Sequence, residues 1–268
     1  MKILFWNTNK NNAINKYIIK LISEEDIDII FLAEYVDKAE ELLKTLRVYP
    51  FEEVRQIGCK RIHVFSRYKE LEFNRHAETL YYTFISIYNE KIGENILVGA
   101  FHLPSKLHSS DENIEVLLYQ ASMEIKEIEQ ETRDFMILTG DFNINPFEKP
   151  MLKYSIFNTY PHLDANINKK QVIHNTEYDK MFNPMWKFIS NRNMPMGTYY
   201  YNSTDYHALN WHVFDQFIIS PKLMPYFKNV SILSRINRMS LLNNNNTINK
   251  EISDHLPILL ELHLEGKF

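Results

Sequence analysis

The sequence predicts an α/β sandwich with helices on its outer faces, formed by a single domain that spans residues 1–268. Short apolar runs alternate with stretches of helical periodicity at the start of the chain and again after residue 110. The strand-like segments fall into two groups, and strands of this kind with helices between them pack as layers. With 268 residues, of which 45% are hydrophobic, the chain is long enough to bury one large core.

The first 46 residues predict a strand–helix–strand–helix unit. Residues 3–5 form a short apolar run typical of a buried strand, and residues 27–33 form a second run that is rich in branched side chains. Residues 37–46 have a helical pattern. The apolar side chains that predict the first helix recur at helical spacing, at Ile14, Ile18, Leu21 and Ile22.

After Pro50 the pattern becomes β-rich. Strands are expected over residues 61–65, 80–88 and 96–101, separated by turn-forming residues. A long amphipathic helix is expected over residues 114–128, and a strand over 135–138. The alternation of helix and strand therefore returns in the second half of the chain.

The pattern weakens from residue 143 to about residue 210, because Pro, Asn and Tyr interrupt short apolar pieces. We expect a long, partly helical excursion there. The last clear strands are residues 213–219 and 258–264. The four asparagines at 243–246 lie between them and indicate a surface loop.

The composition excludes several classes of protein. The six glycines form no cluster, so the chain has neither a GxGxxG turn nor a GxxxxGK[ST] phosphate loop. Cys59 is the only cysteine, which excludes an intrachain disulfide framework and a zinc site of several thiolates, and predicts a reducing compartment. The net charge of -4 argues against binding polyanions through net charge alone, although a bound metal ion can supply positive charge locally.

Export and membrane insertion both require longer apolar segments than this sequence offers. The apolar stretch at the N-terminus stops after a few residues, which is too short for a secretion signal. No run approaches the ~20 apolar residues that cross a bilayer. We therefore expect a soluble, cytoplasmic protein with no membrane partner.

Polar side chains follow the predicted strands, where loops project from a rigid scaffold and sites are usually built. Taken singly, each has an ordinary structural explanation, such as a turn asparagine, a helix cap or a hydrogen-bonded histidine. Taken together, Glu, Asp and Asn oxygens with two histidines are the set that Mg²⁺-assisted phosphoryl chemistry requires. The residues are Asn7, Glu34, His102, Asp141, Asn143, Asp215, Asp254 and His255.

These residues lie in motifs that resemble, in the same order, those of the endonuclease/exonuclease/phosphatase superfamily, to which deoxyribonuclease I belongs. The most specific motifs are G-D-x-N at 140–143 and S-D-H-x-P at 253–257. They are joined by W-N at 6–7, Glu34, S-R-Y at 66–68, H-L-P-S at 102–105 and F-D-Q-F-I-I-S at 214–220. The resemblance covers nearly the whole chain and implies a two-sheet α/β sandwich, deoxyribonuclease I-like and flanked by helices, whose loops converge at one end.

The resemblance also implies a metal site. Glu34 would be the principal Mg²⁺ ligand, with Asn7 close to the metal and Asp254 in its environment. Mn²⁺ is the expected substitute. Carboxylate and amide oxygens suit such hard cations, and a phosphodiester needs a cation to neutralise its oxygens before water can attack.

The catalytic roles follow from the same resemblance. Asp141 and Asn143 would hold the nucleophile and the scissile phosphate. His255, oriented by Asp215, would take the proton from water or stabilise the phosphate. His102 would bind a phosphate oxygen or protonate the leaving group. A histidine with a pKa near its ordinary value of about 6.5 can act on either side of proton transfer at neutral pH.

Two positions depart from the family pattern. Ala33 precedes Glu34 where many members have Gln, and Val213 lies two residues before Asp215 where an Arg is frequent. Neither change removes a core ligand.

Substrate selection must be inferred from residues outside the shared motifs. Arg67, with Lys106 and His108, is expected near the site loops, where it would meet phosphates that flank the scissile bond, the alternative being a solvated surface position. An aromatic segment allows either base stacking or packing in the core. Its members are Tyr199, Tyr200, Tyr201, Tyr206 and Trp211.

The leading functional hypothesis is a Mg²⁺-dependent phosphodiesterase that hydrolyses nucleic acid, either DNA or RNA. One alternative is a phosphatase or phospholipase of the same superfamily that acts on inositol phosphates or sphingomyelin-type lipids. The other is a non-catalytic binding module, which would have no chemical need for the complete set of Glu, Asp, Asn and His residues.

Overall fold

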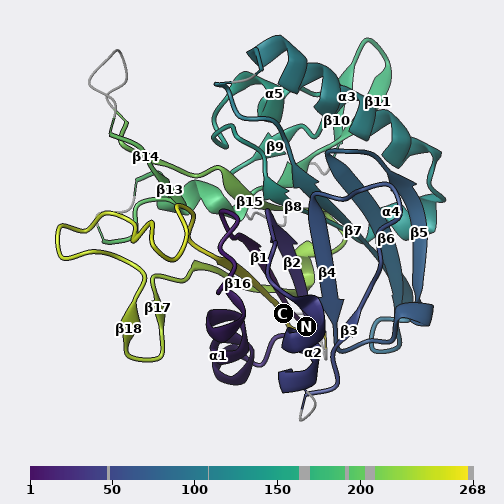
Figure 1. The fold of residues 1–268 in the computed structure, drawn as a ribbon. Coiled ribbons are helices and arrows are strands. Elements are labelled where there is room, and N and C mark those ends of the chain that lie inside the picture. Colours follow the sequence, from purple (N-terminus) through teal and green to yellow (C-terminus); the bar gives the residue numbers. More distant parts are fainter. Residues whose placement is uncertain (47–48, 108, 163–169, 191–192, 203–208, 265–268) are drawn as a thin grey trace.

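Two β-sheets pack face to face, and helices cover their outer sides (Figure 1). The computed structural model describes residues 1–46, 49–107, 109–162, 170–190, 193–202 and 209–264. The predicted α/β sandwich of two sheets is confirmed. The six-stranded sheet has the order β16 (Phe227–Ile232), β19 (Ile258–Leu262), β1 (Lys2–Asn7), β2 (Ile29–Ala33), β4 (Ile62–Ser66) and β3 (Glu52–Glu53).

The seven-stranded sheet contributes the opposite layer. Its order is β5 (Phe73–Glu78), β6 (Tyr82–Asn89), β7 (Glu94–His102), β8 (Met136–Asp141), β15 (Asp215–Ile219), β12 (Met181–Phe182) and β9 (Thr159–Tyr160). Three two-stranded hairpins lie outside the two layers. They are β10 (Lys170–Ile173) with β11 (Thr176–Asp179), β13 (Tyr199–Tyr200) with β14 (Trp211–His212), and β17 (Arg235–Ile236) with β18 (Met239–Ser240).

Each sheet contains a parallel pair of strands that is joined through helices, and the seven-stranded sheet has a second parallel pair, β9 with β12. β1 pairs with β2 across helix α1 (Asn15–Glu25), and β7 pairs with β8 across α3 (Asp111–Glu127) and α4 (Gln130–Asp134). A parallel connection must return to the same edge of the sheet, so its helix lies on the outer face. The carboxyl ends of β1 and β2 therefore meet at one edge, and those of β7 and β8 meet likewise.

The helices form where the sequence predicts them. Three of the apolar residues of the first predicted helix are buried within α1, and Ile14 is buried just before it. Ser110 caps the start of α3, where its hydroxyl accepts a hydrogen bond from the backbone N–H of Asn113. The buried residues of α3 recur at helical spacing and include Ile114, Leu118, Ala121 and Ile125. The helix predicted at 37–46 is α2 (Ala39–Thr45), and α5 (Lys149–Leu152) is a single turn.

The excursion after residue 143 is partly helical, as predicted, but its helices are short. Where the structure describes it, the chain is mainly short strands and hairpins, with α5 and a 3₁₀ helix at Pro184–Phe188 as its only helices. Outside the excursion, two six-residue strands, β5 and β16, and the two-residue strands β3, β17 and β18 also lack a clear signal in the sequence. β5 is an edge strand that carries exposed polar side chains, and therefore has no apolar alternation.

The asparagine-rich segment matches its prediction. The four asparagines at 243–246 are exposed in a turn on the surface. Within the described part of the chain, no helix has both the length and the apolar character needed to cross a lipid bilayer.

The alternation of side chains along the strands decides which residues face the opposite sheet. In β8, Met136 and Leu138 pack under α3, whereas Ile137 belongs to the core between the sheets. Asp141 has the same parity as Ile137, so its side chain lies on the inner face at the end of the strand. By the same alternation along their own strands, the side chains of His102 in β7 and Asp215 in β15 also lie on the inner face.

Candidate active site

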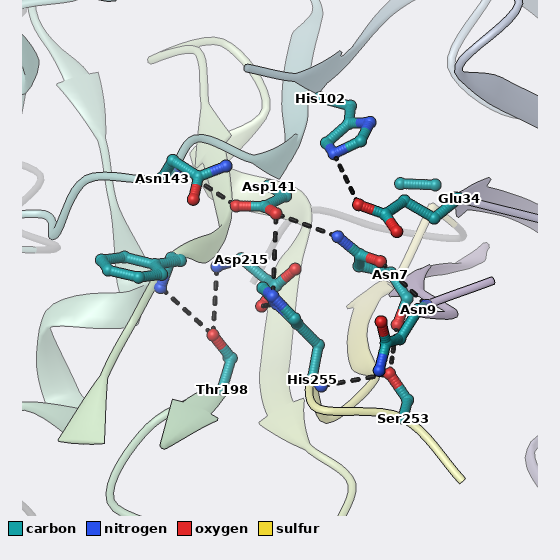
Figure 2. Close-up of polar contacts among 12 residues, drawn as sticks. Asn7, Asn9, Glu34, His102, Asp141, Asn143, Thr198, Asp215, Ser253 and His255 are labelled. Carbon is teal, nitrogen blue, oxygen red and sulfur yellow. Dashed lines mark hydrogen bonds and ion pairs between the residues drawn. The ribbon is translucent and has the colours of Figure 1, made fainter. Parts of the chain in front are cut away.

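Loops from both sheets converge on one cavity of about 820 Å³ at the carboxyl ends of the parallel strands (Figure 2). Six of the predicted chain segments meet there, although they are separated by up to about 250 residues of sequence. The cavity wall includes every predicted catalytic and metal residue except Asp215, which is fully buried. The residues on the wall are Asn7, Glu34, His102, Asp141, Asn143, Asp254 and His255.

Asp141, Asp215 and His255 form the buried half of this site. Nδ1 of His255 lies 2.7 Å from Oδ2 of Asp215, and Nε2 of His255 lies 3.8 Å from Oδ2 of Asp141. The three side chains are at most 7% exposed. Asp215 therefore fixes the orientation of the imidazole, and Nε2 is the ring atom that faces Asp141.

The protonation of the buried half is set by this arrangement. Burial lowers the pKa of His255, but the carboxylates of Asp215 and Asp141 outweigh burial and raise that pKa to about 10. Burial, aided by the charge of Asp215, raises the pKa of Asp141, whereas the His255 imidazole opposes this rise. His255 is therefore a cation near neutral pH in the metal-free protein.

Two asparagines hold Asp141 in place, Asn7 through its side chain and Asn143 through its backbone. The Asn7 amide donates to Oδ2 of Asp141 at 3.0 Å, and the Asn143 backbone N–H donates to Oδ1 at 3.0 Å. Just before Asp141, Gly140 has a φ of +147°, and a Cβ there would lie 2.2 Å from the carbonyl oxygen of Phe101. Only glycine allows the chain to pass β7 this closely, so the G-D-x-N motif is partly a backbone requirement.

Glu34 and His102 form the open half of the site. Nε2 of His102 lies 3.5 Å from Oε1 of Glu34, and Nζ of Lys10 lies 3.9 Å from Oε2. Both distances exceed the usual hydrogen-bond range of about 2.7–3.2 Å. The His102 imidazole lowers the pKa of the Glu34 carboxyl against the opposing effect of burial. Glu34 is thus an anion whose nearest described side-chain partners, His102 and Lys10, lie 3.5 and 3.9 Å from its oxygens.

Long-range hydrogen bonds place the last motif beside the first. The indole N–H of Trp6 donates to the carbonyl oxygen of His255 at 2.9 Å. The Ser253 hydroxyl donates to the carbonyl oxygen of Asn7 at 2.7 Å and accepts from the His255 backbone N–H. These buried contacts place Asp254, which is half-buried, on the cavity wall.

Arg67 is not where the sequence analysis expected it. Its guanidinium donates to Asp26 at 2.6 Å, beside the start of β2, and it does not line the cavity. The reason is strand direction: β4 runs antiparallel to β2, with Ser66 opposite Ile29, so the end of β4 lies at the far edge of the sheet. We therefore withdraw Arg67 from the predicted substrate-binding residues.

Two positioning residues escaped the sequence analysis. The Thr198 hydroxyl accepts hydrogen bonds from the backbone N–H groups of Phe214 and Asp215, both at 3.1 Å. The Asn145 side chain accepts from the Val213 N–H at 2.9 Å. Both fix the loop that precedes β15. Thr198 lies in a stretch without periodicity, and no local signal marks it, whereas Asn145 follows the G-D-x-N motif by two residues.

The aromatic segment divides between the core and the cavity. Tyr200 packs edge-on against Trp211 over the core. Tyr199 stacks on Phe214, which stacks on His212, with ring centroids 5.3 and 4.7 Å apart, and all three line the cavity. Lys106 lines the cavity as well, in ion pairs with Glu148 and Asp111. Tyr206 and His108 lie outside the described residues.

Comparisons with known proteins agree with this architecture. The model of the Endonuclease/Exonuclease/phosphatase family matches residues 4–255. The chain has the fold of D. rerio TDP2, solved with a single-strand DNA product (TM-score 0.58, 16% identity, 98% of both chains covered). It also has the fold of the human nocturnin catalytic domain with bound sulfate (TM-score 0.60, 15% identity, 98% of this chain and 93% of that chain).

A third structure extends the same likeness. The 3′ phosphatase NExo from Neisseria, bound to a product DNA hairpin, has a TM-score of 0.57 at 15% identity, with 98% of this chain and 99% of that chain covered. No curated protein sequence matches the chain.

The two packed sheets, with a cavity that carries the predicted polar residues at the carboxyl ends of their parallel strands, define a deoxyribonuclease I-like protein. Because the family match spans most of its length, the chain belongs to the Endonuclease/Exonuclease/phosphatase family. Members of this family are hydrolytic enzymes that act on phosphodiester bonds.

Proposed function

We propose that this protein is a divalent-metal-dependent phosphodiesterase that hydrolyses nucleic acid, with Mg²⁺ as its metal. The observation that carries the proposal is the convergence of two aspartates, a glutamate, two asparagines and two histidines on one cavity wall. The DNA ligands in the structures of TDP2 and NExo support nucleic acid as the substrate class.

The donor chemistry of the open half fits such a cation. Glu34 presents a partly exposed carboxylate without close hydrogen-bond partners, and the amide of Asn7 and the carboxylate of Asp254 line the same cavity. Hard oxygen donors of this kind suit Mg²⁺ or Mn²⁺. When bound, the cation would neutralise charge on the phosphate oxygens.

The buried half offers a competing ligand set that we consider weaker. One ligand atom from each of Asp141, Asp215 and His255 lies within 4.8 Å of the others. However, Nδ1 of His255 and Oδ2 of Asp215 are already joined at 2.7 Å, and Asp215 is fully buried. We therefore assign these residues to proton transfer and charge stabilisation.

The chain's own residues account for the remaining chemistry. His255, held as a cation by Asp215, donates from Nε2 to a phosphate oxygen. Asp141, held by Asn7 and Asn143, orients the attacking water and accepts its proton. Asn143 donates one amide N–H to the Leu103 carbonyl at 2.8 Å, which leaves its second N–H for the phosphate.

Two roles are open to His102, binding a phosphate oxygen or protonating the leaving group, and its surroundings favour the first. Its Nε2 faces Glu34, and its Nδ1 is buried with no hydrogen-bond partner in the described part of the chain. Because Nε2 is the atom on the Glu34 side of the cavity, we assign His102 to binding a phosphate oxygen next to the cation site.

A product analysis tests the proposal. Purified protein with Mg²⁺ is incubated with labelled single- and double-stranded DNA and RNA, including strands with modified 5′ and 3′ ends. We expect cleavage of at least one nucleic acid, and the products define polarity. Intact nucleic acid, with release of phosphate from an inositol phosphate or of phosphorylcholine from sphingomyelin, would favour the phosphatase or phospholipase alternative instead.

A further inference from the structure

The cavity has a second charged feature, at the side formed by Glu34 and His102, that no motif of the sequence marks. Arg61 lies on the cavity wall and immediately precedes β4, and Ile62 pairs with Ala33 next to Glu34. The guanidinium of Arg61 lies over the ring of Tyr81, 4.9 Å from its centroid. Tyr81 is fixed in turn, because its carbonyl oxygen accepts from the His102 backbone N–H at 2.8 Å.

Arg61 differs from the other two basic residues on the wall. Lys10 faces the Glu34 carboxylate, and Lys106 is paired with Glu148 and Asp111. Arg61 forms no ion pair with any residue that the structure describes. The Arg61 side chain is half-buried beside a cavity that contains carboxylates. Its guanidinium nevertheless contacts the aromatic ring of Tyr81 and pairs with no carboxylate that the structure describes.

We propose that Arg61, stacked on Tyr81, is a binding site for a second phosphate of the substrate, adjacent to the one that is hydrolysed. The guanidinium is planar, its contact with the Tyr81 ring holds it pre-oriented at low entropic cost, and its forked donors match two phosphate oxygens. No acid in the described part of the chain forms an ion pair with these donors, so they remain available to an anionic ligand.

This site narrows the substrate class, and the inference rests on the proposed function. The stack of Tyr199, Phe214 and His212 lies beside His255, whereas Arg61 lies beside Glu34 and His102. A substrate that uses both sides must extend across the cavity and carry at least two phosphates. An oligonucleotide meets this requirement, and a phosphocholine lipid with its single phosphate does not.

The test combines a protein change with a substrate change. Arg61→Met is compared with wild type on an oligonucleotide, and on strands in which an uncharged methylphosphonate replaces the phosphate on one side or the other of the scissile bond. We expect Arg61→Met to lower kcat/KM on the charged strand by about ten- to hundredfold, mainly through KM. At one of the two positions, the methylphosphonate should lower kcat/KM of wild type by the same factor. At that position it should lower kcat/KM of Arg61→Met only slightly further.

Binding without metal gives an independent measurement. In EDTA, fluorescence anisotropy should show weaker oligonucleotide binding by Arg61→Met and a salt-dependence slope smaller by about 1. Arg238→Met, on the exposed β17–β18 turn, is the matched control and should bind like wild type. Arg61→Lys should recover only part of the loss, because lysine keeps the charge but not the planar fork.

The outcomes separate this inference from the function beneath it. If wild type cleaves oligonucleotides and Arg61→Met cleaves and binds them equally well, the Arg61 site is refuted and the phosphodiesterase stands. If wild type cleaves no oligonucleotide, the proposed function is refuted. If, in addition, Arg61→Met leaves metal-free oligonucleotide binding unchanged, the Arg61 site is refuted as well.

Discussion

The two halves of the candidate site differ in how far water reaches them. In the buried half, His255 lies 2.7 Å from Asp215 and 3.8 Å from Asp141, and the three side chains are at most 7% exposed. In the open half, the Glu34 side chain is 24% exposed and its neighbours are 3.5 and 3.9 Å away. Charges interact more strongly where water is excluded, so the buried half is suited to fixed proton positions and the open half to an exchangeable cation.

The largest expected effect comes from the buried half. We predict that His255→Ala and Asp141→Asn each lower kcat by about 10²–10⁴-fold, the usual contribution of positioned acid–base groups. The measurement is kcat at saturating Mg²⁺ on the substrate found by product analysis. Circular dichroism and the melting temperature serve as controls for folding. Near-wild-type turnover in both folded variants would remove these residues from the mechanism.

The next effect concerns the open half and the position of the metal. Mg²⁺ at about 100 times its Kd should stabilise wild type by about 2.7 kcal/mol, which raises the melting temperature by several degrees. Glu34→Gln should largely abolish the rise, whereas Asp215→Asn should retain it. If the rise in melting temperature is instead kept in Glu34→Gln and lost in Asp215→Asn, the metal binds in the buried half.

The charge on His255 gives a sharper view of the buried half. In metal-free protein, NMR of the imidazole should show a pKa far above the value of about 6.5 in unfolded chains, toward about 10. Asp215→Asn should lower it, because the carboxylate on Nδ1 is removed. A pKa near 6.5 in wild type would show that burial cancels the effect of the two aspartates, and a lower value would show that burial outweighs it.

The same shift has a consequence for stability. Because the pKa of His255 is higher in the folded protein than in the unfolded chain, protonated His255 stabilises the folded state. This contribution is fully present below about pH 6.5 and is lost as the pH rises through about 10. The free energy of unfolding of metal-free wild type should therefore fall over this window, and should fall less in Asp215→Asn.

The smallest effect is expected at the outer edge of the open half. Lys10 faces Glu34 from an exposed position, so its charge should weaken cation binding only a few-fold. Lys10→Met should therefore tighten Mg²⁺ binding by that factor in a calorimetric titration, and added salt should reduce the difference. Lys20→Met, on the exposed side of α1, is the control. Weaker binding by Lys10→Met would show that Lys10 assists the metal site.

The sequence predicted the elements whose periodicity is sustained. The β1–α1–β2 unit and the α3–β8 unit were predicted because each buries a clear apolar face. β5 was missed because it carries exposed Asn, Arg and His side chains along a sheet edge, and its pairing with β6 includes an irregularity near Arg75. The short strands after residue 143 are defined by their partners in space, which local patterns do not record.

The candidate site follows the same division. Asp141, Asp254 and His255 were found because short motifs at strand ends combine a backbone requirement, as at Gly140, with chemically distinctive residues. Thr198 was missed because its role is to accept two backbone hydrogen bonds from a loop 16 and 17 residues away.

Arg67 and Arg61 show most clearly what each level of structure decides. The sequence by itself determined that both arginines flank the same short strand, and which residue types follow the other strands. Only the tertiary structure decided that β4 runs antiparallel to β2, which carries Arg67 to the edge near Asp26 and leaves Arg61 beside Glu34. Side-chain periodicity is local and survives in the sequence, whereas strand direction is fixed by pairing between distant segments.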